Sequence, residues 1–285
     1  MDSQGWRMVY QIVRKESRRL FGRRTQWYRY GDDLIVMMLL WAVMNDRPLS
    51  WACQRCYYGG WFRPRQLPSV SQFSRRVRSD RTAELLTAVF QRLAEPSRVT
   101  PVCFLDGKPL VVGPCSKDAE ARAGRVYGGF ARGYKLHAIV SEDRRILCWS
   151  VEPLNVDERR VAPALIEEVK PHILLADGNY DSSDLYDLVA SYGGMLLTPV
   201  PANAGRGHHK QSAARLAAIE SWKGLAGYVY RDRIIIEQTF GNMTSYGGGL
   251  GQLPAWVRTL ARVRLWVGAK VILYHARLGL RRAAA

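Results

Sequence analysis

Two aspartates stand where apolar runs predict β-strands. Asp106 lies inside the run at residues 102–112, and Asp177 directly follows the run at residues 172–176. A buried carboxylate is costly unless something compensates its charge, and two carboxylates on neighbouring strands would repel each other. A divalent cation removes that repulsion, and oxygen ligands in a site left open to phosphate favour Mg²⁺, with Mn²⁺ as a substitute. We therefore predict that Asp106 and Asp177 bind metal in a catalytic site.

The third acidic candidate, Glu237, follows from helical spacing. Steps of three and then four residues place Tyr230, Arg233 and Glu237 on one face of a helix predicted at residues 228–246. On that face Arg233 can hold Glu237 or a DNA phosphate, and Tyr230 can pack on the backbone of a bound strand. The alternative is a surface ion pair between Arg233 and Glu237, worth a few tenths of a kcal/mol.

The elements that must position these residues alternate after about residue 100. Strands are predicted at residues 102–112, 134–141, 146–151, 172–176 and 195–199, and helices at residues 157–169 and 181–191. A meander of strands followed by strands that alternate with helices indicates a mixed α/β sheet of five strands flanked by helices.

The first part of the chain is predicted to be helical. Helices are expected at residues 6–20, 33–44, 70–78 and 80–94. Near residues 96–101 the hydrophobic pattern changes from helical periodicity to short strand-like runs. We therefore predict a helical DNA-binding domain at residues 1–99 and a catalytic domain at residues 100–285. Residues 50–56 and 69–78 suit a helix-turn-helix in which Arg75 and Arg78 face DNA, and the alternative is an ordinary helical bundle with a charged outer face.

The charge of the chain favours nucleic acid as a partner. It has 42 Lys and Arg against 25 Asp and Glu, a formal net charge of +17. Arginines form short groups among aromatic residues, which suits phosphates and bases better than a lipid surface. The longest apolar run, at residues 34–44, is too short to cross a membrane. Five cysteines without a secretory leader indicate a cytoplasmic protein, and the Cys53 and Cys56 pair lacks a second pair at zinc-finger spacing.

Four segments together resemble the DDE transposases of bacterial insertion sequences, in the group with a Tyr-Arg-Glu-Lys signature. They are FLDGKPL around Asp106, GYKLHAIVSEDRRILCWSVEPLNVDE at residues 133–158, LLADGNYDS around Asp177 and YRDRIIIEQTFGNM around Glu237. They occur in the order of the family, from about residue 101 to the last helix. Their combination is specific, whereas an isolated Asp-Gly after a strand is not.

The resemblance implies an RNase H-like catalytic core and a defined chemistry. Asp106 would lie on its first strand, Asp177 after its fourth and Glu237 on a following helix. These three carboxylates would hold two Mg²⁺ ions that serve both cleavage and strand transfer of an insertion sequence. The implied partners are terminal inverted repeats and target DNA, both double-stranded, bound by a homodimer. The implied location is the bacterial nucleoid.

Three further residues complete the predicted DNA contacts. Lys135 and His137 alternate on one strand and so share a face. The resemblance places both near the site, with Lys135 as a phosphate contact and His137 as a residue that orients its neighbours. The signature would put a lysine seven residues after Glu237, where this chain has Thr244, whose hydroxyl can bind a phosphate but supplies no positive charge.

Two other functions are compatible with the same residues. The first is an RNase H-like DNA endonuclease that cuts without joining, because the same carboxylates would serve it. The second is a catalytically inactive DNA-binding protein descended from a transposase. The intact carboxylates argue against this second alternative.

Overall fold

The computed structural model describes residues 3–22, 29–60, 62–95, 100–199, 212–222, 224, 226–245 and 249–283. Contacts divide the chain into two compact units. The helical unit comprises Met1–Glu95, Met243–Val257 and Leu265–Ala285, and the sheet unit comprises Pro96–Asn242 and Arg258–Arg264. The predicted functional domains at residues 1–99 and 100–285 stay a prediction, because a division by contacts assigns no function.

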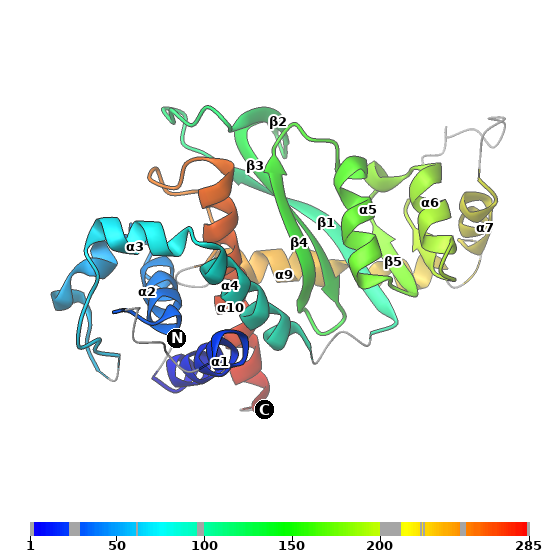
Figure 1. Cartoon of the computed structure of the whole chain (residues 1–285). Coiled ribbons are helices and arrows are strands. Elements are labelled where there is room, and N and C mark those ends of the chain that lie inside the picture. Colours follow the sequence, from blue (N-terminus) through cyan, green and yellow to red (C-terminus); the bar gives the residue numbers. More distant parts are fainter. Residues whose placement is uncertain are drawn as a thin grey trace. The chain divides into compact units, whose positions relative to one another are not determined.

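The sheet unit is built on a mixed sheet with the strand order β2-β3-β1-β5-β6, in which β4 also pairs with β3. The central strand β1 runs antiparallel to β3 and parallel to β5. The predicted α/β class with an RNase H-like sheet is confirmed (Figure 1). The strands are β1 (Val102–Val111), β2 (Arg122–Val126), β3 (Gly129–Ser141), β4 (Ile146–Pro153), β5 (Ile173–Ala176) and β6 (Met195–Leu197).

Helices cover this sheet because each has an apolar face to bury. The helix α5 (Glu158–Val169) packs on β3 and β4 through Val161, Leu165 and Ile166, which are all buried. Asp157 caps its first turn by accepting a hydrogen bond from the Arg159 backbone N–H at 2.9 Å, which fixes Glu158 at the helix start. Further helices of this part include α6 (Ser183–Ala190), α7 (Ala213–Ser221) and α8 (Ala226–Val229).

The helical unit is organised around α2 (Asp32–Met44), whose apolar residues from Ile35 to Leu40 are almost completely buried. Ser69 caps α3 with a reciprocal capping box to Gln72, as the sequence predicts for a helix start there. The other helices are α1 (Ser3–Phe21), α3 (Val70–Val77), α4 (Asp80–Ala94) and the part of α10 (Leu260–Ala283) that belongs to this unit.

Several elements differ from the sequence prediction. Residues 50–56 form two short 3₁₀ helices, η1 (Trp51–Cys53) and η2 (Arg55–Tyr57), so they do not supply the first α-helix of a helix-turn-helix. The helix predicted at residues 228–246 is interrupted by the 3₁₀ helix η5 (Tyr230–Arg233) before α9 (Ile234–Ser245). The strand β2 and the helix α7 were not predicted.

None of the helices in the described part of the chain is long and apolar enough to span a bilayer.

Candidate active site

Asp106 occupies a partly buried position on β1 with too little compensation for its charge. Its Oδ1 accepts a hydrogen bond from the Gly107 backbone N–H at 2.7 Å, and its Oδ2 accepts one from Arg233 Nη2 at 2.7 Å. Burial raises the pKa of Asp106 to about 6, although Arg233 and the Gly107 N–H oppose the shift. The nearby carboxylates of Asp177 and Glu158 raise this pKa further. The local charge is therefore negative and calls for another cation.

Asp177 lies at the end of the strand beside Asp106. Because β5 pairs in parallel with β1 and aligns Ala176 with Leu105, the two aspartates follow at adjoining positions, as the sequence predicts for neighbouring strands. Asp177 Oδ1 accepts a hydrogen bond from the Asn179 backbone N–H at 3.0 Å. Burial and then the charge of Glu158 raise the pKa of Asp177. Both aspartates therefore hold a proton more readily than exposed carboxyls.

Arg233 connects the third predicted carboxylate to the first. Its Nη1 donates to Glu237 Oε1 at 2.9 Å, while its Nη2 donates to Asp106, which lies 127 residues earlier in the chain. Glu237 is 59% exposed, whereas Arg233 and Asp106 are each 17% exposed. The ion pair of Arg233 and Glu237 is therefore more than a surface pair, because the same guanidinium also binds a buried carboxylate.

Tyr230 holds this segment against the sheet. Its hydroxyl donates to the Ala176 carbonyl at 3.1 Å, next to Asp177, and its ring lies 5.0 Å from that of Trp222. Burial raises the pKa of Tyr230 to about 12, so the hydroxyl keeps its proton and remains a donor at neutral pH. Tyr230 thus ties η5 to the end of β5.

Glu158 is a fourth acidic side chain at the site, and it was not predicted from the sequence. Lys135 Nζ donates to Glu158 Oε1 at 2.5 Å, and the two side chains are 13% and 11% exposed. The other oxygen, Oε2, is buried without a hydrogen-bond partner among the described residues. A Cβ atom at residue 107 would lie 2.7 Å from Lys135 Cδ and 3.2 Å from Glu158 Oε1, so Gly107 leaves room for this pair.

A model of the family described as Transposase DDE domain matches residues 97–274. The chain belongs to the DDE transposase family. The match contains Asp106, Asp177 and Glu237 and covers more than half of the chain. Membership places the protein among enzymes of DNA transposition and recombination, which bind DNA and have nuclease or strand-transferase activity. A comparison with curated proteins found no match.

The other residues predicted to contact DNA differ in exposure. His137 is 1% exposed, and burial, with the charge of Lys135, lowers its pKa to about 4. Its neutral ring therefore offers no surface to DNA in this structure, and any role is indirect. Thr244 is exposed, and its hydroxyl donates to the Leu250 carbonyl at 3.2 Å. Arg75 and Arg78 are exposed on α3 and at its end, whereas Arg76 turns inward to Asp32.

No group of three or more His, Cys, Asp or Glu side chains within the described ranges is close enough together to hold a metal ion as it stands. In this arrangement the Arg233 guanidinium lies between Asp106 and Glu237, where it keeps the two carboxylates apart and partly neutralised. The donor set still fits a divalent cation, because Asp106 and Asp177 adjoin each other, and burial and the nearby charge of Glu158 raise the pKa of both.

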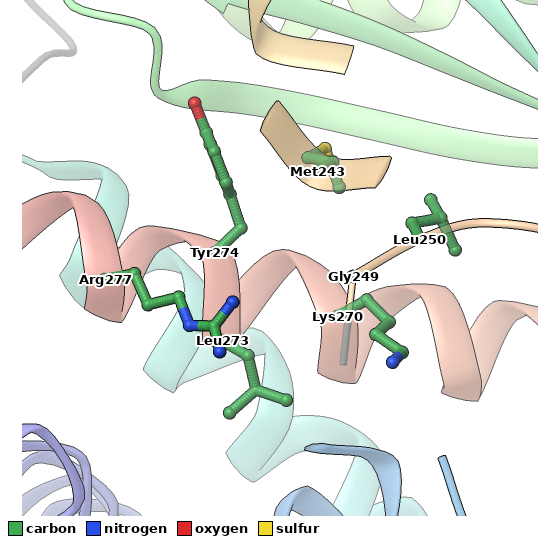
Figure 2. Close-up of a pocket in the computed structure, with 7 residues that line it drawn as sticks. All are labelled: Met243, Gly249, Leu250, Lys270, Leu273, Tyr274 and Arg277. Atoms are coloured by element: carbon green, nitrogen blue, oxygen red, sulfur yellow. The ribbon is translucent and has the colours of Figure 1, made fainter. Parts of the chain in front are cut away.

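A separate pocket in the helical unit contains none of these residues. Figure 2 shows Lys270, Tyr274 and Arg277 projecting from α10, while Met243 and Leu250 come from the end of α9 and the segment after it. Lys270 is 3% exposed and donates to Asp46 Oδ1 at 2.6 Å. The pocket has no carboxylate in its lining, and its buried cation is already paired, so we assign it to packing.

Proposed function

We propose that the protein is a Mg²⁺-dependent DNA transposase that cleaves and joins the strands of an insertion sequence. Asp106, Asp177 and Glu237 are its proposed catalytic residues. The observation that carries this proposal is the single guanidinium of Arg233, which binds Asp106 at 2.7 Å and Glu237 at 2.9 Å, while Asp177 follows the neighbouring strand β5. Arg233 thereby links Asp106 and Glu237, which are far apart in the sequence, and Asp177 follows the strand β5 that pairs with β1.

The proposed ligands of the metal are the carboxylate oxygens of Asp106, Asp177 and Glu237, with Mn²⁺ able to replace Mg²⁺. When bound, the metal would lower the pKa of an attacking water or DNA 3′-hydroxyl and neutralise charge on the scissile phosphate. Asp106 is suited to this role because its carboxylate is buried beside other anions and gains most from a cation. Asp177 is suited for the same reason.

The surrounding residues hold the proposed catalytic side chains in position in the protein without DNA. Arg233 holds Asp106 and Glu237 within reach of one guanidinium, which offsets their charge in the metal-free protein. Tyr230 fixes the same segment to the end of β5. Glu158 fixes Lys135, whose charge acts on Asp177 and is placed to attract a phosphate. Preorganised charges of this kind act on a transition state without reorganising during the reaction.

The proposed substrates are terminal inverted repeats and target DNA, held by a homodimer. A net charge of +17 supplies a general attraction to the phosphate backbone. We assign DNA binding to residues 1–99, where Arg75 and Arg78 are exposed. Thr244 is proposed as a neutral phosphate contact in place of the lysine of the family signature.

A strand-transfer assay on linear DNA whose ends carry the sequences that flank the reading frame tests this proposal. Wild-type protein with Mg²⁺ should give both cleaved and joined products, and EDTA should abolish both. The variants Asp106→Asn, Asp177→Asn and Glu237→Gln should give neither. Asp187→Asn is the matched control, because Asp187 is an exposed acid on α6 that is not one of the proposed ligands.

The same assay separates the alternative functions. Cleaved DNA without joined products would identify an endonuclease. DNA binding without Mg²⁺-dependent cleavage in the wild type would identify an inactive DNA-binding protein. Either result would overturn the proposed strand-transfer activity.

A further inference from the structure

The hairpin formed by β2 and the first residues of β3 exposes two aromatic rings at its tip. Val126 pairs with Gly129, so Tyr127 and Gly128 form the turn between the strands. Gly128 has φ +82°, a backbone conformation that glycine adopts without strain. Tyr127 is 106% exposed and Phe130 is 80% exposed, which makes them the most exposed large hydrophobic residues among those described. Exposed rings of this kind mark interaction sites, because burying their apolar surface against a partner is favourable.

The two faces of this hairpin are different. Paired residues on antiparallel strands point to the same side, so Arg125 and Phe130 share one face, and Ala123 and Arg132 continue it. These four residues are exposed or partly exposed. On the other face, a Cβ atom at Gly124 would lie 2.4 Å from the Leu154 carbonyl. The hairpin therefore rests on the sheet unit through its glycine face and presents the face with the arginines and the ring.

The base of the hairpin is anchored. Arg132 Nη2 donates to the Asp118 carbonyl at 2.7 Å, and the carboxylate of the same Asp118 accepts from the Tyr134 hydroxyl at 2.8 Å. Asp118 and Tyr134 are 2% and 0% exposed. The rings therefore project from a rigid support, which reduces the entropy lost when they bind a partner.

The charge around the rings points to nucleic acid. Arg125, on the face of Phe130, and Arg122, on the opposite face, are both exposed, and neither has an ion-pair partner among the residues that the structure describes. A protein partner or a second copy of this chain, itself at +17, would have to supply acidic groups to match them. DNA supplies phosphates for the guanidiniums and base faces for the rings. Aromatic rings flanked by arginines are the combination that binds unpaired bases.

We propose that this hairpin binds DNA by stacking Tyr127 and Phe130 on unpaired bases while Arg125 contacts the adjoining phosphate. The inference rests on the proposed function, which makes DNA the substrate. Within a duplex each base face is covered by its neighbours, so a ring can reach a base face only at an end or where pairing is lost. The hairpin would thus prefer the opened DNA next to a cleaved strand over intact duplex.

Fluorescence anisotropy in EDTA tests this preference without cleavage. The probes are a short blunt duplex and the same duplex with a few mismatched thymines splayed at one end. Wild-type protein should bind the splayed duplex more tightly. Phe130→Ala should weaken binding of the splayed duplex about tenfold and leave the blunt duplex almost unchanged. Tyr127→Ala should act in the same direction.

Matched variants separate stacking from other contacts. Phe130→Trp keeps an aromatic face and should retain the preference, whereas Phe130→Leu keeps apolar bulk and should lose it. Arg125→Ala should weaken both probes alike and reduce the salt slope of binding by about 0.9. A fluorescent adenine analogue at the splayed end should be quenched by wild type and not by Phe130→Leu.

The outcomes distinguish this inference from the proposed function. Equal binding of both probes by the wild type, or a Phe130→Leu variant that behaves as wild type, overturns the stacking proposal and leaves transposase function intact. Failure of the wild type to bind either probe overturns both. A change of oligomeric state in Phe130→Ala with unchanged DNA binding would show that the rings meet a second copy, against the proposal. Thermal unfolding should confirm that these exposed substitutions leave the fold intact.

Discussion

Two aspartates, the buried Asp32 in the helical unit and the partly buried Asp106 in the sheet unit, differ in how far neighbouring charges compensate their own. Asp32 in the helical unit has one guanidinium on each oxygen, Arg76 at 2.6 Å and Arg81 at 2.7 Å. Asp106 in the sheet unit shares its one guanidinium with Glu237 and has Asp177 and Glu158 as further negative neighbours. Surplus positive charge surrounds the first carboxylate, and surplus negative charge surrounds the second. We infer that Asp32 stabilises its unit, whereas Asp106 is kept ready for a cation.

The largest expected effect is on the reaction. Asp106→Asn should lower Mg²⁺-dependent cleavage by a factor on the order of 10³, because a lost metal ligand removes several kcal/mol of transition-state stabilisation. Cleavage of labelled DNA measures the rate. Retention of activity within tenfold would contradict the comparison, and Asp187→Asn should cleave at the wild-type rate.

Removing the charge of Asp32 should affect stability instead. Asp32→Asn leaves two guanidiniums without their carboxylate and should lower the free energy of unfolding of the helical unit by about 3 kcal/mol. Urea unfolding monitored by circular dichroism gives this value. A stable Asp32→Asn protein would show that the two ion pairs contribute little, and the contrast with Asp106 would then fail.

The pH dependence of stability should differ in sign from that of an ordinary ion pair. Folding raises the pKa of Asp106 from 3.8 to about 6, so the metal-free protein loses stability as the pH rises through this window. Asp106→Asn should therefore be more stable than wild type at pH 8 by about 3 kcal/mol, with the difference vanishing near pH 4. Thermal unfolding in EDTA measures both proteins.

A bound divalent metal ion should offset the lower stability of the wild type relative to Asp106→Asn. Added Mn²⁺ should raise the unfolding temperature of the wild type and not that of Asp106→Asn, because only a protein that binds the ion is stabilised by it. An equal rise in both proteins would mean that the ion binds elsewhere.

A smaller effect is expected at Lys135 and Glu158. Glu158→Gln weakens the hold on Lys135 and should slow cleavage about tenfold, and Lys135→Met should have a similar effect. Because the two side chains act as a pair, the double variant should be no slower than either single variant. Additive losses in this double-mutant cycle would show that Glu158 acts independently of Lys135.

Five of the six strands and both aspartates could be predicted from the sequence, because apolar runs around a charge are a local signal. The position of Glu237 followed from helical spacing, although the 3₁₀ turn at Tyr230–Arg233 was not predicted. Glu158 could not be identified in this way. An acid after the cap Asp157 is typical of any helix start, and only the fold brings it to Lys135.

The strand β2 was missed for a similar reason. Arg122–Val126 contains arginines and a glycine without apolar alternation, and its pairing with β3 is what makes it a strand. The exposure of Tyr127 and Phe130 at the tip of a hairpin therefore could not be predicted from the sequence, because it depends on the pairing of β2 with β3.

The central claim is that Asp106, Asp177 and Glu237 hold the same divalent ions. Fe²⁺ placed in a Mg²⁺ site reacts with added hydrogen peroxide to give Fe³⁺, hydroxide and a hydroxyl radical that cuts the protein backbone near the ligands, and added ascorbate returns the iron to Fe²⁺. The account predicts cuts near residues 106, 177 and 237 together, suppressed by excess Mg²⁺ and lost in Asp106→Asn. Cuts near residues 106 and 177 without any near 237, or cuts that persist in Asp106→Asn, would contradict it.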